Sequence, residues 1–181
     1  MPYCPNLQFS PPANWQDFEL LCWNLWKTIW KDPDTQRHGR SGQAQYGVDI
    51  YGRPNKEKKW AGVQCKGKKN FTDQQLTEEE LFIEVEKAKK FEPSLSAFII
   101  ATTAPRDASI QKAARKLTDL HISAGLFTVS VCAWNDIEEL MLEYKPEIAK
   151  EWYPFLRDEP SDEPSNVEIM AAIHEIRNII P

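Results

Sequence analysis

Apolar and polar positions along this chain repeat with two periods, and the change from one to the other marks the expected elements. Apolar residues at helical spacing predict helices at about 14–30, 77–91, 107–124, 135–144 and 146–156. Short apolar runs predict strands at about 46–52, 60–66, 95–103 and 126–134. Helices interleaved with strands in this order predict an α/β domain.

Polar residues at the ends of these segments support the helix boundaries. Asn14 and Asn135 are expected to cap helices, Thr77 with Glu80 has the spacing of a capping box, and Gly125 follows a helix as a stop residue. The first two strands are expected to form a hairpin. It leads into a right-handed strand-helix-strand crossover, in which the two strands should be parallel.

The C-terminal part of the chain differs in composition from the rest. Residues 158–165 are acidic and contain two prolines, which predicts a stiff linker between a domain at 1–157 and a helix at 166–181. Few residues outside the domain at 1–157 are available to cover the apolar stripe of that helix. It could dock on the core, pair with another copy, or begin a following domain, and we favour the last.

The first helix has two apolar stripes, which predicts burial by the sheet and by a partner.

Chemistry-bearing residues occur in the first two predicted strands. The first contains Gly-Val-Asp-Ile with Asp49, and the second contains Val-Gln-Cys-Lys, in which Gln64 and Lys66 lie two residues apart. Alternate residues of a strand project from the same face, so paired strands would bring all three side chains together. A carboxylate and an amide oxygen suit a hard divalent cation, and a nearby lysine suits an anionic transition state. This combination indicates phosphodiester cleavage.

The charge distribution changes the interpretation of an acidic chain. The net charge is −5, but residues 37–69 contain nine Lys and Arg against two acids, so this window is +7 and the remainder −12. A basic window around the candidate residues favours a phosphate-backbone partner. An exposed, lysine-rich turn at 54–59 would explain the window equally well.

Other classes find little support in the sequence. No apolar run approaches the ~20 residues of a membrane span, and the N-terminus lacks the pattern of a signal peptide. Four widely spaced cysteines favour reduced thiols in the cytoplasm over a zinc site or disulfides. The three histidines are isolated, and the glycines form no phosphate-binding fingerprint.

With these residues in place, the chain resembles the PD-(D/E)xK restriction-endonuclease-like superfamily. The Asp49 and Gln64–Lys66 motifs resemble its Mrr-like branch, in which Gln replaces the second acid. The resemblance covers residues 15–140 by element order. It implies a restriction-endonuclease-like core, an α/β fold with a central mixed β-sheet of about four or more strands flanked by helices.

The resemblance also implies roles for individual residues. Asp49 and Gln64 would bind Mg²⁺, with Mn²⁺ as a possible substitute, and the backbone carbonyl of Cys65 could add a ligand. Lys66 would orient or deprotonate the attacking water or stabilise the phosphate. Glu19 would be a supporting acid on the first helix, and its helical register places it on the face of the tryptophans.

Each of these residues also has an ordinary explanation. Asp49 and Gln64 could be polar residues on a solvated sheet face, and Lys66 one more lysine at a basic strand end. Glu19 could favour the first turn of a helix because of its dipole. Nucleic-acid contacts are expected from residues flanking the motifs, where loop polarity alone is the alternative: Arg40, Gln43, Gln45, Lys68 and Lys69.

The sequence therefore predicts a Mg²⁺-dependent endonuclease that cuts double-stranded DNA with little sequence preference. The resemblance extends to N-terminal effector domains of bacterial anti-phage defence proteins, which implies a homo-oligomer, assembled through the first or the C-terminal helix, and a following NTPase or sensor domain. Two alternatives stay open: an inactive nucleic-acid-binding module on the same fold, and a scaffold for assembly.

Overall fold

The computed structural model describes residues 9–39, 45–67 and 75–153. The chain forms two compact units, 1–149 and 150–181, and the sheet with its flanking helices belongs to the first. Helix α5 (Pro146–Trp152) spans the end of the first unit and the start of the second. The predicted linker at 158–165 and the helix at 166–181 lie outside the described residues.

A five-stranded mixed sheet forms the centre of the first unit. Its strands lie in sequence order: β1 (Gln36–Arg37), β2 (Ile50–Gly52), β3 (Trp60–Lys66), β4 (Leu95–Thr102) and β5 (Thr128–Cys132). β1, β2 and β3 pair antiparallel, whereas β3, β4 and β5 pair parallel. The predicted hairpin and parallel crossover are therefore confirmed, as is the α/β class with a mixed sheet of at least four strands.

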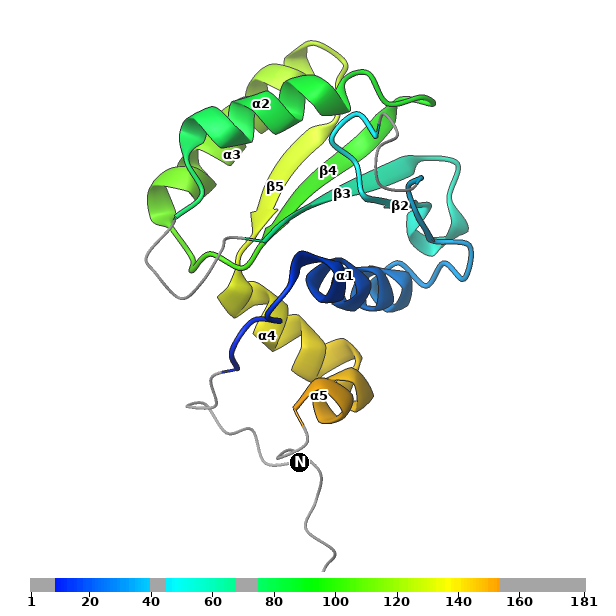
Figure 1. The fold of residues 1–181 in the computed structure, drawn as a ribbon. Helices are drawn as coiled ribbons and strands as arrows, with labels where there is room; N and C mark the ends of the chain where they lie inside the picture. The colour runs from blue at the N-terminus through cyan, green and yellow to red at the C-terminus, as the bar shows by residue number, and fades with distance from the viewer. Residues whose placement is uncertain (1–8, 40–44, 68–74, 154–181) are drawn as a thin grey trace, which may run out of the picture. The chain divides into compact units, whose positions relative to one another are not determined.

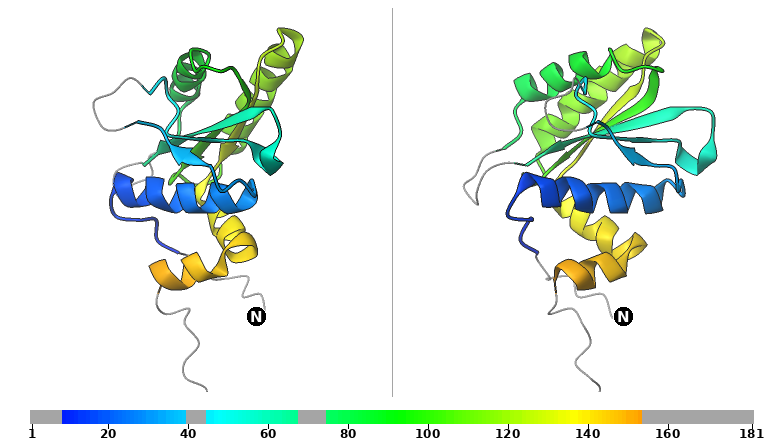
Figure 2. Two further views of the ribbon diagram at one scale, coloured as in Figure 1. Left: turned by 90° about the vertical axis from the view of Figure 1, so that its right-hand side faces the viewer. Right: turned by 45° about the vertical axis from the view of Figure 1, so that its right-hand side comes forward.

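Helices cover both faces of the sheet, as Figure 1 and Figure 2 show. α2 (Glu78–Ala88) and α3 (Ala108–Ser123) lie on one face, and α1 (Trp15–Ile29) and α4 (Trp134–Tyr144) lie on the other. The core on the α2 side includes Val85 of α2, Phe98 and Ile100 of β4, and Leu117 of α3. Burying each such side chain stabilises the fold by roughly 1.5–3 kcal/mol relative to leaving it exposed.

The first helix is buried along one broad face, which includes residues of both predicted apolar stripes, whereas Trp23 and Ile29 of those stripes are only partly buried. Phe18, Leu21, Cys22 and Leu25 are at most 1% exposed, and the chain reverses after Trp30, which is also buried. Asn14 caps this helix by accepting a hydrogen bond from the backbone N–H of Asp17, at 2.8 Å. Most of this apolar surface is thus covered within the first unit itself.

Two other helices begin where local chemistry predicted. Thr77 and Glu80 form the expected capping box, each side chain accepting a hydrogen bond from the other residue's backbone N–H. Asp107 caps α3 by accepting hydrogen bonds from the N–H groups of Ser109 and Ile110. Gly125, at φ +70°, follows the end of α3 as expected for a helix stop.

Three expectations were wrong in detail. Asn135 does not cap α4, because the helix begins one residue earlier and the Asp136 carboxylate accepts from the Ala133 N–H instead. The Asn135 side chain accepts a hydrogen bond from the backbone N–H of Arg106. The strand expected at 46–52 begins only at Ile50, because a tight turn occupies the residues before it. β1 lies in a segment predicted to be a loop.

Within the described ranges, no helix is both long enough and apolar enough to cross a membrane.

Two glycines offer a matched test of the packing between the turn before β2 and α2. Gly47 and Gly125 have nearly the same backbone, at φ +68° and +70°. A Cβ at Gly47 would lie 3.0 Å from Glu84 Oε2 and from Lys87 Cβ, whereas a Cβ at Gly125 would meet nothing within 4 Å. We expect Gly125→Ala to cost about 1–2 kcal/mol of unfolding free energy and Gly47→Ala to cost more. Equal losses in urea denaturation would show that the contact with α2 contributes nothing.

Candidate functional site

The turn before β2 sets the position of Asp49. The Val48 N–H donates to the Gln45 carbonyl at 3.0 Å, and both residues between them, Tyr46 and Gly47, have positive φ. Such two-residue turns favour glycine because a side chain there crowds the backbone. Val48 is completely buried in the core on the α2 side, which fixes the direction in which the chain leaves the turn.

The backbone of Asp49 is held from both sides. Its N–H donates to the Val63 carbonyl of β3 at 2.8 Å, and its carbonyl accepts from the His38 N–H at 2.6 Å. The residue therefore continues the sheet by one position before β2 begins. Its side chain lies beside the carboxyl end of β3, where Gln64, Cys65 and Lys66 are.

One oxygen of the Asp49 carboxylate receives two hydrogen bonds from neighbouring residues of β3. Gln64 Nε2 and the Cys65 backbone N–H each donate to Asp49 Oδ2 at 2.7 Å. The structure thus brings Asp49 and Gln64 into direct contact, from segments that the sequence separates by a turn. A carboxylate tied to two rigid donors is fixed in place and has its second oxygen left for other contacts.

The side chains of β3 alternate between the two faces of the sheet. Gln64 and Lys66 lie on the α2 side, and Lys66 contacts that helix directly. The Cys65 thiol lies on the α1 side and forms a hydrogen bond with the Cys22 thiol. Burial of this sulfur, reinforced by Cys22, raises the pKa of the Cys65 thiol. Cys65 therefore faces the site with its backbone rather than its sulfur.

Lys66 is paired with an acid that the sequence analysis did not identify. Lys66 Nζ donates to Glu84 Oε1 of α2 at 2.7 Å, and Lys87 Nζ donates to the same oxygen at 3.0 Å. The Glu84 side chain is only 4% exposed, compared with 29% for Lys66 and 51% for Lys87. A buried carboxylate needs such partners, because an unpaired charge inside a protein is costly.

A signal for Glu84 was present in the sequence. Glu84 lies three residues after Leu81 and four before Ala88, so it belongs to the buried stripe of its helix. The same criterion, an acid on an apolar helical face, had drawn attention to Glu19. We call Asp49, Gln64, Lys66 and Glu84 the carboxylate site.

Glu19 approaches from α1, on the opposite face of the sheet. Its carboxylate lies 3.9 Å from the Arg37 guanidinium and is 18% exposed. Partial burial raises the pKa of Glu19, and the charge of Arg37 opposes this shift. Glu19 is near enough to Asp49 to raise the pKa of that residue. The structure thus places Glu19 next to the carboxylate site as an electrostatic neighbour.

Burial dominates the ionisation of Asp49. It raises the pKa of the carboxyl group from 3.8 to about 6, although the hydrogen bond from the Cys65 N–H lowers it. The negative charges of Glu19 and Glu84 raise the pKa further, and the positive charge of Lys66 lowers it. Lys66 and Lys87 pair with Glu84, and Arg37 lies beside Glu19, so Asp49 is the carboxylate whose charge a bound cation would offset most.

The residues that could hold a metal ion at this position are Asp49, Gln64 and Cys65. Gln64 Oε1 is buried and has no hydrogen-bond partner in the described part of the chain. The Gln64 amide presents its nitrogen to Asp49 Oδ2 and to the Cys65 carbonyl, at 2.7 and 3.4 Å. Gln64 Oε1 would therefore join the Asp49 carboxylate and the Cys65 carbonyl as a hard oxygen donor only after the amide turns over. Residues 9–39, 45–67 and 75–153 contain no group of three or more His, Cys, Asp or Glu placed to hold a metal. Mg²⁺ suits such a sparse site, since it keeps several waters and binds substrate phosphates.

Among the residues expected to contact nucleic acid, Gln45 is the one that the structure describes. Gln45 Nε2 donates to the His38 carbonyl at 2.7 Å, which closes the base of the loop between them. Arg40, Gln43, Lys68 and Lys69 lie outside the described residues.

Comparisons with known proteins give one distant likeness. No family model matches the chain, and no curated protein matches it. Among solved structures, it is similar to MspJI restriction endonuclease in complex with a 27-mer oligonucleotide, with a TM-score of 0.44 and 15% sequence identity. The likeness covers 78% of this chain and 32% of that chain, so this chain spans about a third of the neighbour.

The raised pKa of Asp49 makes the stability of the metal-free protein depend on pH. Between its ordinary pKa of 3.8 and the folded value of about 6, the folded protein holds a proton that the unfolded chain has lost. This stabilising contribution is complete below about pH 4 and is lost as pH rises through about 6. We expect Asp49→Asn, which cannot ionise, to gain stability relative to the wild type over this range. Urea midpoints measure the difference, and a constant difference would contradict the shift.

Proposed function

We propose that this chain is a metal-dependent endonuclease domain that hydrolyses phosphodiester bonds of DNA. The observation that carries the proposal is the hydrogen-bonded pair of Asp49 and Gln64, 2.7 Å apart, with the Lys66–Glu84 ion pair on the same face of the sheet. This arrangement combines oxygen ligands for a cation with a fixed ammonium group. It agrees with the roles that the resemblance to PD-(D/E)xK nucleases implies for these residues.

The site residues divide the chemistry between them. Asp49, Gln64 Oε1 and the Cys65 carbonyl would hold Mg²⁺, which when bound supplies Lewis-acid polarisation of a phosphoryl oxygen. Asp49 must be ionised to bind the metal, so its raised pKa should weaken Mg²⁺ binding as pH falls through about 6. The Cys65 N–H keeps Asp49 oriented, since its hydrogen bond holds one carboxylate oxygen in place.

Lys66 supplies the positive charge nearest to the ligands. Its ion pair with Glu84 fixes the ammonium group at the carboxyl end of β3, with 29% of the side chain still exposed. A lysine held in this way can donate hydrogen bonds to a phosphate as negative charge develops in the transition state. Glu84 is then a positioning residue, because it acts on the phosphate only through Lys66.

Basic residues of the sequence window lie at two ends of the β2–β3 hairpin. Exposed lysines at positions 56, 58 and 59 are in the connecting turn, where Arg53 lies over Trp60, whereas Lys66 is at the opposite end of β3. A polyanion that contacts both groups would run along the hairpin. Phosphate contacts of this kind are not sequence-specific, so the proposal is for double-stranded DNA cleavage with little sequence preference. A role as an effector domain in anti-phage defence, acting as an oligomer with a sensor or NTPase domain, follows from the resemblance alone.

A second function is favoured by one specific contact. Lys66 has a structural partner in Glu84, so its presence is explained without catalysis. A nucleic-acid-binding module that has lost cleavage would keep the same ion pair. The two functions differ in what happens to a bound phosphodiester.

Lys66 and Lys87 provide a matched pair of variants for this choice. Both lysines donate to the same oxygen of Glu84, and Lys87 belongs to α2 rather than to the strand beside Asp49. We expect Lys66→Ala to lower plasmid nicking in Mg²⁺ by about a hundredfold or more, as for loss of other transition-state donors. Lys87→Ala should keep most of the activity, because it removes the same charge and ion pair without emptying the site.

Asp49→Ala and addition of EDTA should each abolish nicking. Cleavage that survives both changes, or that falls equally in the two lysine variants, would rule out the proposed roles. DNA binding without cleavage, unaffected by Lys66→Ala, would favour the binding module.

A further inference from the structure

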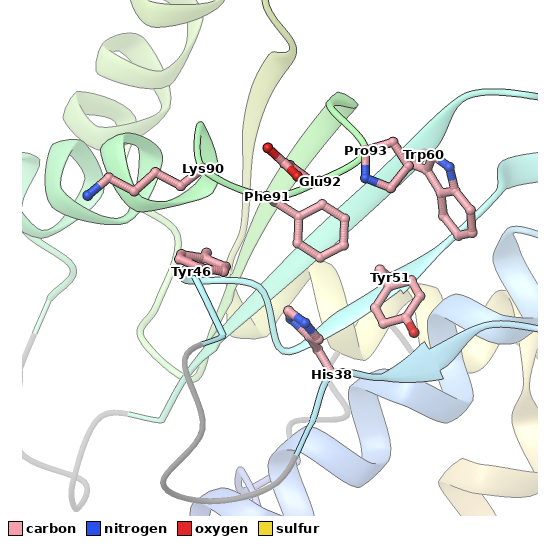
Figure 3. Close-up of a pocket in the computed structure, with 8 residues that line it drawn as sticks. All are labelled: His38, Tyr46, Tyr51, Trp60, Lys90, Phe91, Glu92 and Pro93. Carbon is pink, nitrogen blue, oxygen red and sulfur yellow. The ribbon is translucent and has the colours of Figure 1, made fainter.

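An aromatic pocket is lined in part by the segment of chain that contains Asp49. Its cavity of about 650 Å³ is lined by His38, Tyr46, Tyr51, Trp60 and Phe91, together with Lys90, Glu92 and Pro93. The volume lies within the usual range for small-molecule sites, about 300–1,000 Å³. Figure 3 shows the rings arranged around one space, with Phe91 above Tyr51 and His38, and Trp60 beside them.

The rings support one another, so the pocket is formed before any ligand arrives. Tyr51 lies with its ring centre 5.6 Å from that of Phe91 and 5.8 Å from that of Trp60. The His38 ring meets Tyr51 and Phe91 edge-on, at 5.5 and 5.2 Å. Tyr51 also donates its hydroxyl hydrogen to Gln36 Oε1, at 3.0 Å. Preformed aromatic surfaces bind planar groups with little loss of side-chain entropy.

The charges around the pocket distinguish between planar ligands. A quaternary ammonium is disfavoured here, because the Arg53 guanidinium lies over the Trp60 ring at 5.3 Å and repels a second cation. Lys90 and Glu92, the charged residues of the lining, both extend away from the rings in Figure 3. Aromatic faces beside one cation suit a flat base that carries a phosphate.

The pocket is also close to the proposed reaction centre. His38 donates its backbone N–H to the Asp49 carbonyl, and its Nδ1 lies 3.0 Å from the Val48 carbonyl. Tyr51 follows Asp49 by two residues, about 6.6 Å along a strand. A nucleic-acid strand at Asp49 would therefore pass the aromatic pocket.

We propose that the aromatic pocket receives an unpaired nucleobase of the nucleic-acid substrate, which stacks on Tyr51 and Trp60, with Phe91 buried behind them. The choice of nucleic acid rests on the proposed function, but the stacking does not depend on cleavage. The domain therefore prefers DNA with unpaired or easily unpaired bases over a rigid duplex. Every base has an aromatic face, so this contact adds affinity without sequence preference.

The test compares binding of two labelled oligomers to the full 181-residue chain in EDTA, measured by fluorescence anisotropy. One is a 12-mer single strand and the other is the same sugar–phosphate backbone without bases. We expect Tyr51→Leu and Trp60→Leu each to weaken binding of the first roughly tenfold to a hundredfold, and binding of the second hardly at all. Tyr51→Phe and Trp60→Phe keep a ring and should bind nearly as the wild type does.

Tyr144→Leu serves as the control, because Tyr144 is 42% exposed on α4 and does not line the pocket. Losses that are equal for both oligomers, or equal in Tyr144→Leu, would overturn the proposal. So would unchanged binding by Tyr51→Leu and Trp60→Leu when circular dichroism shows that both are folded. The plasmid assay is independent of these outcomes. If the wild type nicks plasmid but Tyr51→Leu and Trp60→Leu bind the oligomers unchanged, only the base-binding proposal is refuted. If binding depends on the bases but no nicking occurs, only the nuclease proposal is refuted.

Discussion

Two hydrogen bonds to a single carboxylate oxygen join the edge of the sheet to its interior. Asp49 Oδ2 accepts from the Gln64 side chain and from the Cys65 backbone, both at 2.7 Å, and these bonds hold the acid against the carboxyl end of β3. The backbone of Asp49 joins the same region, because its N–H donates to the Val63 carbonyl and its carbonyl accepts from the His38 N–H. Because the carboxylate is also largely buried, the same bonds that order this edge hold an acid where water is scarce.

Burying Asp49 creates an electrostatic imbalance that the surrounding residues only partly remove. Glu84 is neutralised by two lysines, and Glu19 faces Arg37 at the longer distance of 3.9 Å. Asp49 has no basic residue in direct contact among the described residues, and burial raises its pKa to about 6. Beside it, Gln64 Oε1 is buried without a hydrogen-bond partner in the described part of the chain. A divalent cation would resolve both features at once, which is why they are best understood together.

The sequence was informative wherever structure depends on neighbouring residues. The capping box of Thr77 and Glu80, the alternation along β3 and the parallel crossover could all be predicted, since each is a local pattern or follows from element order. Lys66 was predicted to meet Asp49 and Gln64, but its ion pair is with Glu84, eighteen positions away. That pair, the pairing of β1 with β2 and the aromatic pocket each join segments distant along the chain. Periodicity within one segment does not specify such contacts.

The most direct test is the position of a bound cation. In crystals grown or soaked with Mn²⁺, which gives an anomalous signal, we expect a peak within coordination distance of the Asp49 carboxylate and Gln64 Oε1, and none in Asp49→Asn. The hydrogen bond from Gln64 Nε2 to Asp49 should then be replaced by contacts of the amide oxygen with the metal. Mn²⁺ found only elsewhere, with that hydrogen bond intact, would contradict the account of this site.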